Sequence, residues 1–223
     1  MTAPAFPDAS ALLVLPGPAG ALELAVDLPD ADTPRVPATA IVCHPLPTEG
    51  GTMHNKVVTM AARSLRELGI ATVRFNFRGT GASAGVFDHG EGEGEDLRAV
   101  ARWVREQRPG DALWLAGFSF GAYVSLKLAS ELGPAVLVSI APPAGRWDLA
   151  AIDTPRMPWL VVQGDADEIV DPQAVHAWLE SLDSDAQLVR MPDTSHFFHR
   201  KLLDLRGAIK HGVKPWLPAP AAA

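Results

Sequence analysis

Short apolar runs alternate with amphipathic stretches along most of the chain. The runs suit buried or edge strands and span residues 11–15, 21–28, 36–43, 70–77, 112–116, 135–140, 157–163 and 186–191. Apolar residues recur at helical spacing in the stretches 54–68, 95–107, 122–129, 172–182 and 197–209. The first two runs flank a Pro-Gly turn and predict an antiparallel hairpin at a sheet edge. Elsewhere strands alternate with helices, which predicts a mainly parallel twisted sheet with helices on both faces.

Composition narrows the class of protein. The 223 residues are 48% apolar and carry a net charge of −7, which argues against nucleic acid and anionic membrane surfaces as partners. The one cysteine, Cys43, excludes an intrachain disulfide, and no apolar run is long enough to span a membrane. We therefore expect one cytoplasmic domain over residues 1–223, with 215–223 as a loose C-terminal tail. The sequence leaves the oligomeric state open.

The connection between the run 112–116 and the next helical stretch carries the first candidate chemistry. It reads Gly117-Phe118-Ser119-Phe120-Gly121, a G-x-S-x-G in a sharp turn from strand to helix. Such a turn holds the central serine in a strained conformation at the end of the sheet, where the helix N-terminus points free N–H groups towards it. A Gly-Ser loop is the alternative, but the predicted flanking strand and helix favour a nucleophile elbow. This segment resembles the α/β-hydrolase family.

A serine nucleophile needs a base, and the base needs an orienting acid. In the α/β-hydrolase family the acid follows a later strand, and here the loop 164–171 supplies four carboxylates. Asp171 precedes Pro172 and suits a helix N-cap, and Glu168 is expected to face solvent. Asp165 and Asp167 remain. The family's G-x-x-D-x-x-V pattern favours Asp167, and Asp165 is then a turn residue.

Two histidines follow the next predicted strand. His196 lies in the loop and matches the family's histidine before the last helix, so the resemblance implies that it is the general base. His199 is expected in the first helical turn. The pair could also be read as an H-x-x-H metal motif, but no third ligand is indicated by spacing, so we predict neither a metal nor a cofactor.

The resemblance also implies an oxyanion hole. One donor is the amide after the nucleophile, that of Phe120, and the other comes from the loop that begins at His44. Proline has no N–H, so the amide of Leu46 is the expected second donor rather than that of Pro45. His44 is expected to shape this loop.

Further stretches are expected to be structural. Residues 78–83 resemble the family's Gly-rich turn, and 88–96 form an acidic glycine run that we interpret as a solvated loop before the next helix. Residues 44–58 together with 74–79 are similar to a small bacterial subgroup of uncharacterised serine α/β-hydrolases, a resemblance that covers most of the chain.

Only residues 141–156 separate two strands where many relatives insert a cap domain, so we expect a capless fold and an open mouth. Phe118, Trp147 and Phe197 are expected to bind substrate in its wall, together with Phe120. The sequence thus predicts a carboxylesterase-like serine hydrolase with a Ser119–His196–Asp167 triad, acting on a small acyl substrate. A thioesterase, a peptidase or acyltransferase on the same triad, or a non-catalytic binding protein are the alternatives.

Overall fold

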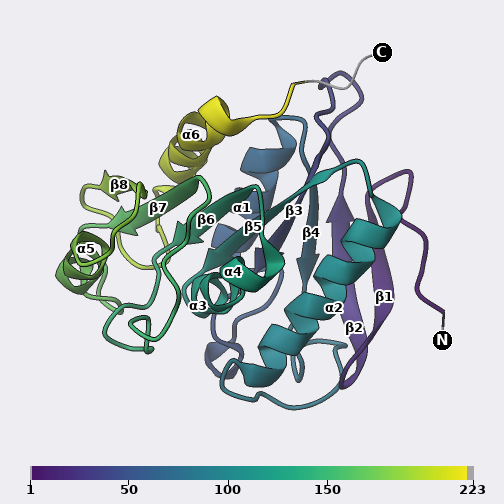
Figure 1. The fold of residues 1–223 in the computed structure, drawn as a ribbon, viewed down its shortest axis with the longest axis horizontal. Coiled ribbons are helices and arrows are strands. Elements are labelled where there is room, and N and C mark those ends of the chain that lie inside the picture. The colour runs from purple at the N-terminus through teal and green to yellow at the C-terminus, as the bar shows by residue number, and fades with distance from the viewer. Residues whose placement is uncertain (1, 220–223) are drawn as a thin grey trace.

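The computed structural model describes residues 2–219 and is built on one sheet with the strand order β1-β2-β4-β3-β5-β6-β7-β8 (Figure 1). The strands are β1 Ala11–Gly17, β2 Gly20–Asp27, β3 Ala38–Cys43, β4 Ala71–Phe75, β5 Ala112–Phe118, β6 Val136–Ile140, β7 Trp159–Gly164 and β8 Gln187–Met191. The α-helices are α1 Lys56–Arg66, α2 Glu91–Gln107, α3 Phe120–Lys127, α4 Ala129–Leu132, α5 Pro172–Glu180 and α6 Leu202–Val213. Two 3₁₀ turns, η1 Pro47–Glu49 and η2 Lys214–Trp216, complete the regular structure.

Strand directions follow the sequence prediction. β1 and β2 form an antiparallel hairpin, and β2 also runs antiparallel to β4. All pairings from β4 through β3 to β8 are parallel. The predicted α/β-hydrolase fold, with its N-terminal hairpin and mainly parallel sheet, is therefore confirmed.

Two apolar layers cover the two faces of the sheet. Along β3, Ile41 and Cys43 join the layer under α2, α3 and α5, whereas Ala40 and Val42 join the layer under α1 and α6. This alternation follows from the two-residue repeat of a strand. Burial of both faces explains why the central strands are continuous apolar runs.

The acidic run forms part of a helix, so its interpretation as a solvated loop is wrong. α2 begins at Glu91, and the Glu93 carboxylate accepts hydrogen bonds from the amides of Asp88 and Gly90, which caps the helix. The fully buried Asp96 carboxylate pairs with Arg78 at 2.9 Å. The sequence pattern missed this because the carboxylates are neutralised by partners that only the folded chain brings to them.

The last helix begins later than predicted, at Leu202. Phe198 and Arg200 have positive φ values of 53° and 58°, which an α-helix cannot contain, so His199 lies in a loop and not in a helical turn. Beyond α6, Trp216 and Leu217 pack against the apolar layer under α1 and α6. The predicted tail is therefore attached at its start, and its residues 220–223 lie outside the described part of the chain.

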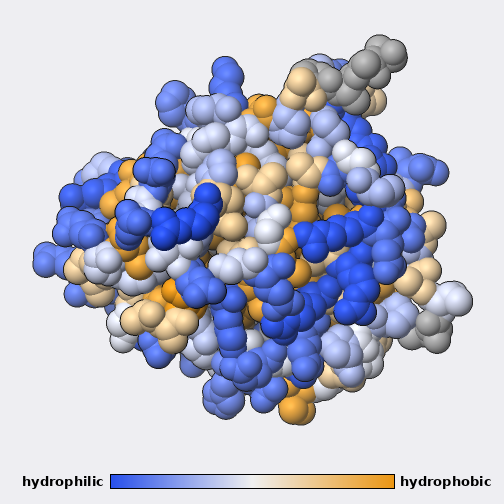
Figure 2. All heavy atoms as spheres, viewed as in Figure 1, coloured by the Kyte–Doolittle hydropathy of each residue, from blue (hydrophilic) through white to orange (hydrophobic). Residues whose placement is uncertain are grey.

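Hydrophilic side chains gather over the exposed side of α2 (Figure 2). Within residues 2–219, no helix combines the length and apolar character that crossing a bilayer requires.

Candidate active site

Ser119 lies at the turn between β5 and α3, in the middle of the sheet. Its backbone has φ 54° and ψ −117°, a strained conformation for a residue with a side chain. A Cβ atom on Gly117 would come within 2.2 Å of the Gly121 carbonyl oxygen, and one on Gly121 within 2.3 Å of the Cys43 carbonyl oxygen. Both glycines are needed because backbone segments touch there, and this contact holds the serine at the end of the strand.

Ser119, His196 and Asp167 meet at the carboxyl end of the sheet. His196 Nε2 is 3.1 Å from Ser119 Oγ, and His196 Nδ1 is 2.8 Å from Asp167 Oδ2. An ionised carboxylate at Nδ1 favours the tautomer with its proton on that nitrogen, which leaves Nε2 free to accept from the hydroxyl. The side chains of His196 and Asp167 are almost completely buried, whereas Ser119 remains 9% exposed.

Asp167 is held as an anion by four hydrogen bonds. Its Oδ1 accepts from the amides of Ile169 and Val170, and its Oδ2 accepts from His196 and from Gln163 Nε2. Burial raises the pKa of Asp167, but the bonds from His196 and Val170 outweigh burial and keep the pKa below its ordinary value. The sequence reasoning missed Gln163, although a glutamine at the end of an apolar strand is a visible signal.

The other carboxylates of this loop have different partners. Asp165 pairs with Arg190 on β8 at 3.0 Å, and Asp171 caps α5 by accepting from the Gln173 amide. Glu168 is exposed as expected, and it also accepts a hydrogen bond from the backbone amide of His196. The geometry therefore places Asp167, rather than Asp165, against the imidazole.

Direct backbone contact joins the loop of Asp167 to the loop of His196. The amide of Asp165 donates to the Met191 carbonyl, and the amide of Ala166 donates to the Thr194 carbonyl. A Cβ atom on Gly164 would come within 2.3 Å of the same Thr194 oxygen. These contacts fix the separation between acid and base, because neither loop can shift alone.

Leu46 and Phe120, whose amides are the expected oxyanion donors, both line the cavity that contains Ser119. Phe120 is the first residue of α3, so its N–H has no partner within the helix. The buried His44 accepts from the Phe77 amide through Nε2 and donates from Nδ1 to the Pro45 carbonyl at 2.6 Å. Because carbonyl and N–H point in opposite directions across a trans peptide, this bond turns the Leu46 N–H away from His44.

His44 makes stability depend on pH. Burial lowers its pKa to about 4, well below its ordinary value, so the folded protein keeps it neutral where the unfolded chain protonates it. The unfolded state then binds more protons between about pH 6.5 and 4, and stability falls as pH falls through this window. We expect a loss of about 3 kcal/mol in the free energy of unfolding. Urea denaturation at several pH values measures it.

The matched variant is His44→Gln, which keeps a hydrogen-bond acceptor but cannot titrate. Its free energy of unfolding should vary much less between pH 6.5 and 4 than that of the wild type. Equal slopes in the two proteins would show that another group causes the dependence.

The cavity at Ser119 has a volume of about 410 Å³. Trp147 and Phe197 line it as predicted, together with Phe120, Glu49 and Arg146; Arg146 donates to the Ile169 carbonyl. Phe118 does not line the cavity. It is fully buried behind His196, with ring centroids 5.0 Å apart, because it is the last residue of a central strand and points into the layer under α1 and α6.

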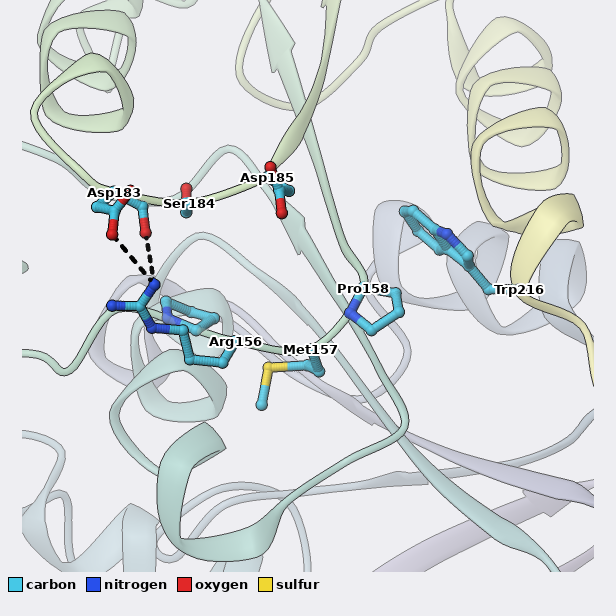
Figure 3. A pocket seen from close by; sticks show the side chains of 8 residues that line it. Arg156, Met157, Pro158, Asp183, Ser184, Asp185 and Trp216 are labelled. Atoms are coloured by element: carbon cyan, nitrogen blue, oxygen red, sulfur yellow. Dashed lines mark hydrogen bonds and ion pairs between the residues drawn. The ribbon is translucent and has the colours of Figure 1, made fainter.

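A second hollow lies at the opposite end of the sheet, where β7 begins (Figure 3). Arg156 donates there to the Asp183 carbonyl, and Met157 and Trp216 also line the hollow. It is separated from Ser119 by the length of the strands. In residues 2–219, no group of three or more His, Cys, Asp or Glu side chains is arranged to hold a metal ion.

Comparison with known proteins agrees with this geometry. A family model described as X-Pro dipeptidyl-peptidase (S15 family) matches residues 22–155, more than half of the chain. The chain belongs to the S15 family of α/β serine hydrolases. This hydrolase is 71% identical to a lidless α/β serine hydrolase from Xanthomonas campestris, whose structure matches with a TM-score of 0.95 over 97% of this chain and 99% of that chain. The predicted capless family is confirmed.

More distant relatives cover nearly the same length. An α/β serine hydrolase homologue from Coxiella burnetii is 44% identical, with a TM-score of 0.90 over 94% of this chain and 100% of that chain. Uncharacterized protein RP471 of Rickettsia prowazekii is 32% identical over 80% of this chain and 79% of its own length.

Proposed function

We propose that this hydrolase is a carboxylesterase-like enzyme that cleaves small acyl esters through an acyl-enzyme. The observation that carries the proposal is the pair of hydrogen bonds from Ser119 to His196 and from His196 to Asp167. Both distances lie within the reach that proton transfer requires, and the base is oriented by a buried anion.

In the proposed reaction, His196 Nε2 takes the Ser119 proton while Oγ attacks the acyl carbon. The negative charge that develops on the carbonyl oxygen is bound by the amides of Leu46 and Phe120, and each such donor typically contributes about 3 kcal/mol to lowering the barrier. His196 then returns the proton to the leaving alcohol. Water attacks the acyl-enzyme by the same route, and no cofactor is needed.

The open cavity supports short acyl chains as substrates. Its aromatic wall of Phe120, Trp147 and Phe197 offers an apolar surface, and no cap covers it to enclose a long chain. A fluorophosphonate probe should label Ser119, and p-nitrophenyl esters should be hydrolysed without strong preference for long chains. An unlabelled protein would point to a binding function on this fold, and a strong preference for long acyl chains would contradict the open site.

Peptide cleavage is the second candidate, because the family model is described as X-Pro dipeptidyl-peptidase. Such a reaction needs a group that binds the free N-terminal ammonium of the peptide, and Glu49 in the cavity wall has the required charge. Gly-Pro-p-nitroanilide tests this candidate directly, and a thioester in the same panel tests thioesterase activity. The cytoplasmic location and the absence of nucleic-acid and membrane partners stay predictions.

A further inference from the structure

A further cavity, different from the hollow at the start of β7, has a volume of about 460 Å³ and adjoins the cavity at Ser119. It lies between the start of α1 and the segment that follows His196. The two cavities share Asn55 and Phe197 in their linings, so these two residues form the boundary between them. We call this further cavity the α1 groove; its lining is Thr52, His54, Asn55, Lys56, Val57, Phe197, His199, Arg200 and Leu202.

The lining of the α1 groove has one sign of charge. Lys56 and Arg200 are exposed cations, His54 and His199 add two imidazoles, and no carboxylate lines the groove. Glu23 is the carboxylate that faces His54, and its own hydrogen bonds go to Asn76 and the Ala82 amide.

Lys56 and Arg200 are also unpaired, in a protein with an excess of acidic residues. Most of the other lysines and arginines form ion pairs with carboxylates. Lys56 and Arg200 form none with any residue in the range 2–219. An unpaired cationic groove on a protein of net charge −7 is a local attraction for anions.

The backbone around Arg200 is strained in a way that serves this arrangement. Phe198 and Arg200 both have positive φ values, and Phe198 is fully buried in the apolar layer. The anchored Phe198 leaves its neighbours Phe197, His199 and Arg200 on the outside, where they line the groove. Backbone strain of this kind is typically retained where a side chain has a function.

The proposed reaction indicates which part of an ester substrate would lie nearest to this groove. His196 returns its proton to the leaving oxygen, so the alcohol part of an ester lies on the His196 side of Ser119. Phe197, which follows His196, forms the boundary to the α1 groove, and its ring is 5.1 Å from that of His196. An alcohol part long enough to pass this aromatic ring would face the groove that Lys56 and Arg200 line.

We propose that the α1 groove binds a carboxylate or phosphate carried by the alcohol part of the substrate, so that the preferred substrates are acyl esters of anionic alcohols or phenols. This inference rests on the proposed role of Ser119. It predicts that charge at the far end of the leaving group raises kcat/KM, mainly through a lower KM.

The test compares acetyl esters that differ in the charge of the leaving group. 4-Acetoxybenzoate and 4-acetoxyphenyl phosphate are the anionic substrates, 4-acetoxybenzamide is the uncharged match, and 3-(4-acetoxyphenyl)propanoate with its amide gives a longer reach. Each kcat/KM is divided by the rate of the same ester in buffer alone, which corrects for leaving-group reactivity. At low salt we expect a ratio of carboxylate to amide of at least about fivefold, falling towards one in 0.5 M NaCl because salt screens exposed charges. The larger of the carboxylate and phosphate ratios identifies the anion.

The variant Lys56→Gln/Arg200→Gln should remove the preference, which means that its ratio of carboxylate to amide falls to about one even at low salt. The matched control is Arg102→Gln/Lys214→Gln, which loses the same charge at two positions outside both cavities and should keep the preference. Arg102 and Lys214, like the test pair, form no ion pair within residues 2–219.

Two results would overturn the inference. The first is that the wild type prefers the carboxylate neither in the benzoate ester nor in the longer phenylpropanoate ester. The second is that the preference survives in the Lys56→Gln/Arg200→Gln variant. Failure of the proposed function is separate, because it would abolish turnover of every ester, charged or not. If no ester is hydrolysed, the role of the α1 groove is tested by measuring the binding of unreactive phenols instead. Calorimetry with 4-hydroxybenzoate and 4-hydroxybenzamide should show tighter binding of the anion, lost in the Lys56→Gln/Arg200→Gln variant, and equal binding of the two would refute the groove's role.

Discussion

Replacing Ser119 with alanine should lower kcat for short p-nitrophenyl esters by at least about a thousandfold. Alanine keeps the shape of the turn but removes the atom that lies 3.1 Å from His196 Nε2. The remaining groups can polarise an ester and position water, but no covalent intermediate can form. Steady-state kinetics on a short acyl ester, with thermal unfolding to confirm that the variant folds, measures the effect.

Ser195→Ala is the matched control. Its hydroxyl is buried close to His196 and has no hydrogen-bond partner within residues 2–219, so its loss should change kcat little. Turnover of the Ser119→Ala protein near the wild-type level would reject Ser119 as the nucleophile.

Asp167→Asn should lower kcat by about 10³- to 10⁴-fold, with the fold retained. The carboxylate accepts the His196 Nδ1–H at 2.8 Å, whereas an amide NH₂ in the same place favours the opposite tautomer. Nε2 would then carry the proton and could not accept one from Ser119. The pH profile of kcat on the same ester, together with a fluorophosphonate labelling rate, separates this effect from a loss of substrate binding.

Asp165→Asn is the neighbouring comparison. Asp165 pairs with the half-exposed Arg190 at the surface, and such pairs contribute about 0.2–1 kcal/mol to stability and nothing to the tautomer of His196. Its kcat should stay within a few-fold of wild type. A severe loss in Asp165→Asn with a mild one in Asp167→Asn would exchange the roles of the two residues.

The local pattern of apolar residues was sufficient to predict the strands and helices, but it misplaced the starts of two helices. The central strands are apolar on both faces, so their positions are visible without any tertiary information. The start of α2 was missed because Glu93 and Asp96 look solvated until the cap and Arg78 are in place. The start of α6 was missed because positive φ at Phe198 and Arg200 leaves no trace in apolar spacing.

For the candidate site, the sequence predicted the three reacting residues, and the structure showed which other residues hold them in place. Ser119, Asp167 and His196 follow three separate strands, and parallel strands carry their carboxyl ends to one edge of the sheet. The sequence analysis passed over Gln163 and expected His44 to shape its loop, but only the structure showed that Gln163 bonds to Asp167 and His44 to the Pro45 carbonyl. Phe118 was misplaced for the same reason, since a residue at a strand end can face the cavity or the apolar layer.

The sequence by itself determined the order of strands and helices and the turn at Ser119, because periodicity and glycine spacing are local properties. The choice of Asp167 and His196 came from the resemblance to the α/β-hydrolase family. Only the tertiary structure decided which side chains touch: the hydrogen bond from the Phe77 amide to His44, the burial of Phe118, and the alignment of Lys56 with Arg200 along one groove. Such contacts join residues far apart in the chain, and their geometry depends on how the layers pack against the sheet rather than on any short stretch of sequence.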